Sequence, residues 1–285
     1  MTVPAGGWVL WAGTLGFETP VLERLDAARH LDVQRFSVTP LDLDPEVGAR
    51  IGPAELGRRI RDAGYDVVLD PIVGWYGGTP HPGSRFGRYS TDQTLIWAEQ
   101  LGAVAVNLIG QSVHDVSMET LVGAFGAVCD RAAGFGAQAH LEFTPITAIT
   151  DLASGWDIVR HADRTNGGLL FDTWHFFRSV PDLVLLEQIP GDRIFSVQVS
   201  DALAATGELD IRQDTQRRLL PGHGQLDLNS ALQVLARTGG LSWVGPEVIA
   251  PEMAAMPPVE SARLADHAVR QLVAGLRPSA LGEEA

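Results

Sequence analysis

Short apolar segments alternate with helical patterns eight times along the 285 residues of this chain. Strands that are apolar almost throughout are typical of parallel sheets that other elements cover on both faces. Eight strand–helix units in a chain of this length match the size of one barrel of eight strands and eight helices. The predicted fold class is therefore α/β, a (β/α)8 TIM barrel forming a single domain. A doubly wound open sheet is the alternative.

The boundaries of the units follow from the apolar runs and from helix signals such as Pro at a start or Gly at an end. The predicted strands lie at residues 8–12, 33–38, 65–75, 103–110, 137–143, 167–172, 193–201 and 241–249. The predicted helices lie at residues 19–30, 53–64, 92–101, 118–135, 152–164, 182–188, 228–238 and 259–276. The barrel is expected to span residues 1–276, with a disordered tail at 277–285.

The charged residues exclude several classes of protein. The formal net charge is −14, which disfavours a protein that follows the phosphate backbone of a nucleic acid. All 21 basic residues are arginine. Schiff-base aldolases, pyridoxal-phosphate enzymes and P-loop nucleotide hydrolases depend on a lysine, so this chain is none of these.

The single cysteine, Cys129, excludes an internal disulfide and a cysteine-rich zinc site. Its neighbours in the segment GAFGAVCDRAAG favour a buried structural thiol in a helix over a nucleophile. The segment at residues 1–13 has no basic region before its apolar patch, which predicts a first strand and not a signal peptide. No apolar run reaches membrane-spanning length, so we expect a cytoplasmic protein with no membrane partner.

Polar side chains end four of the predicted strands. The fifth strand ends in HLEF with Glu142, and the sixth ends in LLFD with Asp172. The seventh, FSVQVSD, carries Gln198 and Asp201, and the eighth, WVGPEV, carries Glu247. The active site of a barrel of this kind lies at the carboxyl ends of its strands. We therefore expect these groups to converge at one mouth of the barrel.

Three carboxylates in one small site must become protonated or hold a cation. Oxygen ligands without cysteine favour Mn²⁺ or Mg²⁺, with Co²⁺ also suitable. The predicted ligands are Glu142, Asp172, Gln198 and Glu247. A single carboxylate at a strand end is more often a helix cap or a loop charge, so the prediction depends on the four occurring together. Asp201 either caps the next turn or supports the ligands from behind.

Aromatic residues follow Asp172 in the sequence TWHFFR. His175 is either a structural histidine or, as we favour from its place in a strand-end loop, a group of the site. The side chains of Trp174, Phe176 and Phe177 either pack in the core or form an apolar wall for a substrate. The Gly-rich segments GWYGG and PGHGQ match no phosphate-binding fingerprint.

Several of these motifs, taken in this order, resemble the xylose isomerase-like TIM-barrel superfamily. The motifs are LEF at Glu142, FDTWH at 171–175, VQVSD at 197–201, RRLLPGHGQLDL from Arg217 and PEV at Glu247. The resemblance implies one divalent ion held by Glu142, Asp172, Gln198 and Glu247. The usual family pattern has His at the third of these positions. Glutamine at this position offers an amide oxygen instead of an imidazole nitrogen, which makes the ligand set harder. Some lyases of the family, including dehydroshikimate dehydratase-like members, also have glutamine at this position.

The resemblance also implies a mechanism for a small polyhydroxylated keto substrate. The ion would bind a carbonyl and a neighbouring hydroxyl oxygen and stabilise an enediolate. Glu142 and Glu247 would act as acid and base, and His175 would donate a proton to a substrate oxygen. The substrate would contact Trp174, and Arg178 and Arg217 would hold a distal group, unless they are ordinary loop arginines.

Return of the proton gives an isomerase or epimerase of a keto-sugar or cyclitol, which is the favoured function. Expulsion of a β-leaving group instead gives a metal-dependent lyase, such as an inosose or 3-dehydroshikimate dehydratase, or an elimination from a 3-keto sugar. A barrel that binds without catalysis, or that works only with a partner subunit, is a third alternative. It has no need of three convergent carboxylates. A homo-oligomer is the default expectation for the exposed helices.

Overall fold

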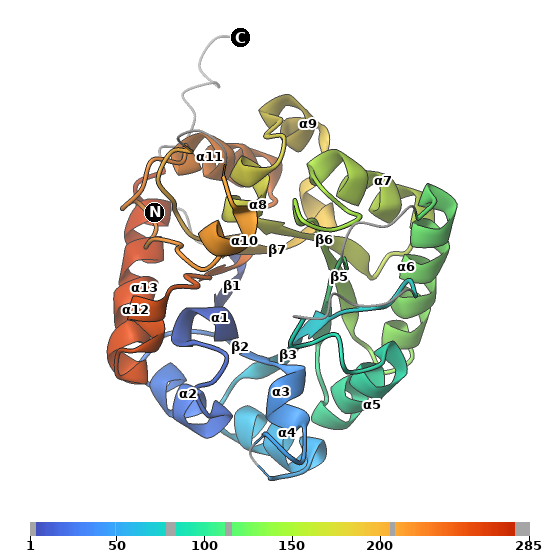
Figure 1. Ribbon diagram of the computed structural model, residues 1–285, viewed down its shortest axis with the longest axis vertical. Helices are drawn as coiled ribbons and strands as arrows, with labels where there is room; N and C mark the ends of the chain where they lie inside the picture. The colour runs from blue at the N-terminus through green and yellow to red at the C-terminus, as the bar shows by residue number, and fades with distance from the viewer. Residues whose placement is uncertain (1–3, 49, 78–83, 112–115, 206–208, 277–285) are drawn as a thin grey trace.

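The computed structural model describes residues 4–48, 50–77, 84–111, 116–205 and 209–276. Within these residues eight strands close into a parallel barrel in the order β1 to β8, with β1 paired to both β2 and β8 (Figure 1). The strands are Ala5–Leu10, Arg35–Val38, Asp66–Ile72, Ala105–Ile109, Gln138–Glu142, Gly167–Asp172, Ile194–Val199 and Ser242–Pro246. The closed barrel confirms the predicted fold class. The tail at 277–285 lies outside the described residues.

The longer helices form an outer ring around the barrel (Figure 1). They are α2 Val21–Ala28, α4 Pro53–Asp62, α5 Thr91–Leu101, α6 Met118–Ala133, α7 Leu152–Ala162, α9 Leu183–Gln188, α11 Leu228–Thr238 and α13 Pro258–Ala274. Shorter elements, absent from the sequence prediction, are α1 Ala12–Leu15, α3 Pro40–Leu43, α8 Thr173–Arg178, α10 Ile211–Asp214, α12 Pro251–Ala254 and the 3-10 turn Gly191–Arg193. None of the described helices has the length and apolar character needed to cross a bilayer.

Alternation along each strand decides which side chains enter the barrel. His140 on β5 lies 2.9 Å from the hydroxyl of Ser196 on β7 (Nδ1 to Oγ), and these strands are not neighbours. The contact therefore crosses the barrel interior. Glu142, two residues after His140, faces inward at the carboxyl end of β5. Asp172 on β6 is aligned with Gln198 on β7, so the two end their strands at the same level.

The lone thiol packs between a helix and the barrel wall. Cys129 lies in α6 and is fully buried. A Cβ atom built on Gly167 of β6 would lie 2.9 Å from its sulfur, so the glycine leaves the space that the thiol fills. Burial and, after it, the charge of Asp130 raise the pKa of Cys129 to about 12. The thiol therefore contributes to packing and stays protonated.

His140 is expected to make stability depend on pH. Burial in the barrel and, after it, the charge of the nearby Arg35 guanidinium lower the pKa of His140 to about 3. In the unfolded chain the same ring takes up a proton near pH 6.5, so stability falls as the pH drops from about 6.5 towards about 3. Between pH 7 and pH 5 this residue alone is expected to cost the folded protein about 2 kcal/mol.

The measurement is urea unfolding of the native protein and of His140→Gln at both pH values. The variant is expected to lose about 2 kcal/mol less than the native protein on acidification. Equal losses in the two proteins would show that His140 does not carry this pH dependence.

Candidate active site

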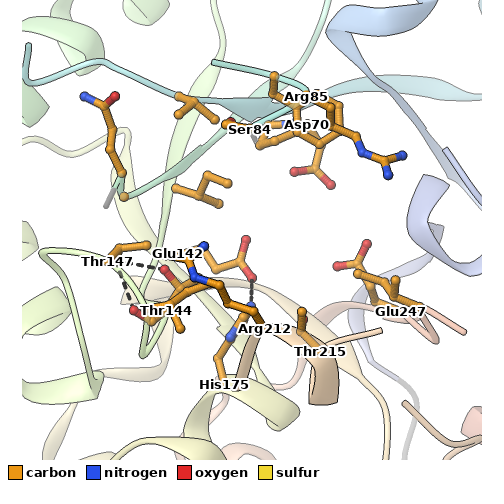
Figure 2. A pocket seen from close by; sticks show the side chains of 18 of the residues that line it. Asp70, Ser84, Arg85, Glu142, Thr144, Thr147, His175, Arg212, Thr215 and Glu247 are labelled. Atoms are coloured by element: carbon orange, nitrogen blue, oxygen red, sulfur yellow. Dashed lines mark hydrogen bonds and ion pairs between the residues drawn. The ribbon is translucent and has the colours of Figure 1, made fainter. Parts of the chain in front are cut away.

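The carboxyl ends of the strands open into a cavity of about 390 Å³. Its wall includes Asp70 of β3, Glu142 of β5 and Glu247, which follows β8. Figure 2 shows the carboxylates of these three residues pointing into the same open space from different sides. All three residues are buried, with exposed fractions of only 5 or 6%. The base of the cavity is therefore strongly acidic.

The turn after β6 places His175 beside this acidic base. Asp172 ends the strand and caps α8, because its Oδ1 accepts a hydrogen bond of 2.9 Å from the backbone N–H of His175. The sequence predicted a loop here, and the capped helix replaces it. The Nε2 atom of His175 lies 3.1 Å from Glu142 Oε1. Ligand atoms of Asp172, His175 and Glu142 all lie within 4.8 Å of one another.

A buried arginine balances part of the negative charge. Nη1 of Arg218 donates to Asp172 Oδ2 at 2.7 Å, and Nη2 lies 3.3 Å from Nε2 of His175. Arg218 is 3% exposed, and its guanidinium carbon lies 5.0 Å from the centre of the Trp174 ring. Burial lowers the pKa of Arg218, but the carboxylates around it, Asp172 first, outweigh this and raise it. The guanidinium therefore stays charged at the base of the cavity.

Asp70 and Glu247 form no ion pair with any residue that the structure describes. Burial and, after it, the charge of Glu142 raise the pKa of Asp70 to about 8. The pKa of Glu247 lies well above its usual value, because of burial and then the charge of Asp70. Asp70 was absent from the sequence prediction. Its signal was the second acid of the strand DVVLDPI, which lies among apolar residues, where a charge needs a compensating function.

The residues present fit a divalent cation. Gln198 is fully buried, and neither Oε1 nor Nε2 of its amide has a hydrogen-bond partner in the described part of the chain. A buried amide without partners is costly unless a ligand engages it. Its strand neighbour Asp172, together with Glu142 and Glu247, supplies carboxylate oxygens nearby. Such oxygen donors would hold a hard ion such as Mn²⁺ or Mg²⁺.

Three residues expected to contact substrate are not among the described residues that line the cavity. Nε of Arg178 is bonded to Asp214 Oδ2 at 2.7 Å, and its Nη2 donates to the carbonyl of Leu203 at 2.7 Å. Trp174 is fully buried and donates from Nε1 to the same carboxylate at 3.0 Å. Arg217 is exposed and, unlike its neighbour Arg218, is not among the residues that line the cavity. The carboxylate of Asp214 thus holds Arg178 and Trp174 outside the site.

Asp201 organises the long loop after β7. It pairs through its backbone with Leu219 in a short antiparallel bridge. Its carboxylate also accepts hydrogen bonds of 2.8–3.1 Å from the backbone N–H groups of Ala202, Gly222, Gly224 and Leu226. Of the two functions weighed for it from sequence, this network matches the cap, and the support of the ligands stays a prediction. The bridge fixes the chain next to Arg218 and so helps to place the buried guanidinium.

The family of the chain follows from a match over nearly its whole length. A model of the xylose isomerase-like TIM barrel matches residues 14–272. The chain belongs to this family, which confirms the resemblance of its motifs.

Its relatives are enzymes. Inosose isomerase of Bacillus velezensis is 29% identical over 147 residues, which are 50% of this chain and 51% of that protein. The 3-dehydroshikimate dehydratase of Pseudomonas putida is 33% identical over 85 residues, 30% of this chain and 13% of that protein. The chain thus spans about half the length of the inosose isomerase and a small part of the dehydratase.

Solved structures share the fold. The IOLI protein with a bound zinc atom has a TM-score of 0.81 at 19% identity, covering 95% of this chain and 99% of that chain. An L-ribulose 3-epimerase has a TM-score of 0.71 at 18% identity, covering 95% of this chain and 94% of that chain. At these identities the likeness concerns the barrel itself.

Proposed function

We propose that this protein is a divalent-metal-dependent isomerase or epimerase of a keto-sugar or cyclitol. The proposal is carried by the carboxylates at the ends of the strands: Glu142 and Glu247 line the cavity, and Asp172 has a ligand atom within 4.8 Å of one of Glu142. The unpartnered amide of Gln198 lies on the strand beside Asp172. The inosose isomerases among the relatives act on a cyclitol ketone by name, which supports the same class of small polyhydroxylated keto substrate.

The two glutamates suit proton transfer on a flat carbon centre. Glu142 and Glu247 face each other across the open space, so each can reach a different face of a bound substrate (Figure 2). One carboxylate takes the proton next to the carbonyl, and the other returns a proton from the opposite face. Arg218 and His175 lie where they can donate hydrogen bonds to a substrate oxygen. A bound Mn²⁺ or Mg²⁺ would supply Lewis-acid polarisation of the carbonyl.

The second candidate is a metal-dependent lyase. Two features favour it: the glutamine at position 198 and the 33–34% identity to two 3-dehydroshikimate dehydratases over 85 residues. The first proton abstraction by a glutamate is the same. His175 would then donate its Nε2 proton to a departing hydroxyl group, so that water leaves and a carbon–carbon double bond forms.

The test is the metal content of protein loaded with Mn²⁺ and freed of excess ion by gel filtration. About one Mn²⁺ per chain is expected for the native protein, with at least tenfold weaker binding in Gln198→Ala and Asp172→Asn. Gln213→Ala, which removes an exposed amide on α10, is the matched control and should bind like the native protein. A native protein that takes up no Mn²⁺, Mg²⁺ or Co²⁺ would overturn the proposal.

The loaded protein would then be incubated in deuterated water with an inosose, a keto-hexose and 3-dehydroshikimate. Deuterium uptake with retention of the hydroxyl groups supports an isomerase. Loss of water with formation of an alkene supports the lyase.

A further inference from the structure

Two exposed arginines line the same cavity as the buried carboxylates. Arg85 precedes α5, and Arg212 lies in α10, next to Thr215 and Gln216 on the same wall. Both arginines are exposed, whereas the carboxylates at the base are buried. Figure 2 shows the two side chains on opposite walls of the open space. They therefore stand at the entrance, on either side of anything that reaches the base.

Arg212 is available for a ligand. Among the residues that the structure describes, its guanidinium has no carboxylate or carbonyl partner within hydrogen-bond distance. The arginines near it differ in this respect, since Arg178 is held by Asp214 and Arg218 by Asp172. An unpaired guanidinium on a cavity wall offers two parallel N–H donors, which match the two oxygens of a carboxylate.

Arg85 can join such a contact at small cost. Its Nη1 lies 3.1 Å from Glu18 Oε1, and the two side chains are 47% and 82% exposed. An ion pair this exposed contributes little to stability, so Arg85 can exchange Glu18 for a bound anion. Its guanidinium carbon also lies 5.4 Å from the centre of the Phe17 ring, which keeps the head group close to the cavity wall.

The distribution of charge decides how an anionic ligand would be oriented. The base holds four carboxylates, those of Asp70, Glu142, Asp172 and Glu247, against the single buried cation of Arg218. Among the described residues the cation at the base, Arg218, is already bonded to Asp172, so the base offers a ligand carboxylate no free charged donor. A neutral sugar has no charge for the arginines at the entrance to attract. In a sugar acid, these arginines attract the carboxylate end and not the rest of the molecule.

We propose that Arg212, assisted by Arg85, binds a carboxylate of the substrate at the entrance and thereby directs the keto end to the acidic base. Within the proposed function, the substrate class is then narrowed to a keto-sugar or cyclitol that carries a carboxylate, which is a polyhydroxylated keto acid. This inference rests on the proposed function, because it takes the acidic base as the place of reaction.

The test is calorimetric binding of two probes to the Mn²⁺-loaded protein: quinate, a cyclic polyol with a carboxylate, and myo-inositol, a neutral one. Quinate is expected to bind at least about tenfold more tightly, as a charge-assisted bidentate contact provides. Arg212→Gln should weaken quinate binding about tenfold and leave myo-inositol unchanged. Arg217→Gln, the exposed arginine outside the cavity, is the matched control and should change neither constant.

The outcomes separate this inference from the proposed function. Metal-dependent binding of myo-inositol as tight as that of quinate would overturn the inference and leave the proposed function standing. The same follows if Arg212→Gln and Arg217→Gln weaken quinate equally, since the effect is then one of net charge. A loaded protein that binds neither probe would contradict both proposals.

Discussion

Arg218→Met is expected to lower the free energy of unfolding of the metal-free protein by about 3–5 kcal/mol. The substitution keeps the volume of the side chain but removes the cation that lies 2.7 Å from Asp172 Oδ2. Asp172 is fully buried, so its carboxylate is left without a counter-ion in a place where Glu142 and Glu247 already crowd it. Urea unfolding in the presence of a chelator at pH 7 measures the loss.

Arg217→Met is the matched control, because it removes the same charge one residue earlier at an exposed position. Its effect should stay within about 0.5 kcal/mol. The double variant Asp172→Asn with Arg218→Met should recover part of the lost stability, since the orphaned charge is gone. If Arg218→Met costs no more than Arg217→Met, the buried ion pair does not stabilise the folded protein.

Glu142→Gln is expected to slow proton exchange on the substrate by about 10²–10⁴-fold. The amide keeps the size of the side chain and an oxygen that can still face a metal, but it cannot accept the proton from carbon. Exchange is followed by NMR as deuterium uptake by an inosose in deuterated water, with the Mn²⁺-loaded protein. The metal content is measured on the same samples, so that loss of the ion is told apart from loss of the base.

Glu187→Gln serves as the control for Glu142→Gln, because it neutralises an exposed glutamate on α9 that is paired with Arg237. This variant should exchange at the native rate. Exchange in Glu142→Gln within threefold of native would assign the proton transfer to another carboxylate of the cavity.

The barrel was predictable because the same sequence pattern, an apolar strand followed by a helix, is repeated along the chain. Each strand is a short apolar run, and each is followed by a helix with an apolar face, so single errors do not alter the fold class. The four- to six-residue helices α1, α3, α8, α10 and α12 were missed because one turn is too short to show helical periodicity. The start of β1 was set late, since Gly6 and Gly7 lack strand character. Both have positive φ angles, near the register shift between Ala5 and Trp8.

Where the strands end predicted the carboxylates of Glu142 and Glu247 that line the cavity, but not Asp70 or the buried arginine. The sequence contains two adjacent arginines, and nothing local tells which of them enters the barrel. Arg218 enters because its backbone N–H is bonded to the carbonyl of Ile249 and the next residue pairs with Asp201. Similarly, Asp214 follows Trp174 by 40 positions and removes it from the site. Only the folded chain brings such partners together.

The network around Asp201 fixes the backbone of the loop after β7 through backbone atoms and not through the loop's own side chains. The carboxylate is bonded to the backbone N–H groups of Gly222, Gly224 and Leu226, so the loop is held by atoms that every residue except proline possesses. The side chain of His223 takes no part in this hold. Changes at such outward positions can therefore alter what the rim of the barrel presents, while the guanidinium at its base stays in register. The outward side chains of this loop can therefore vary while its backbone conformation stays the same.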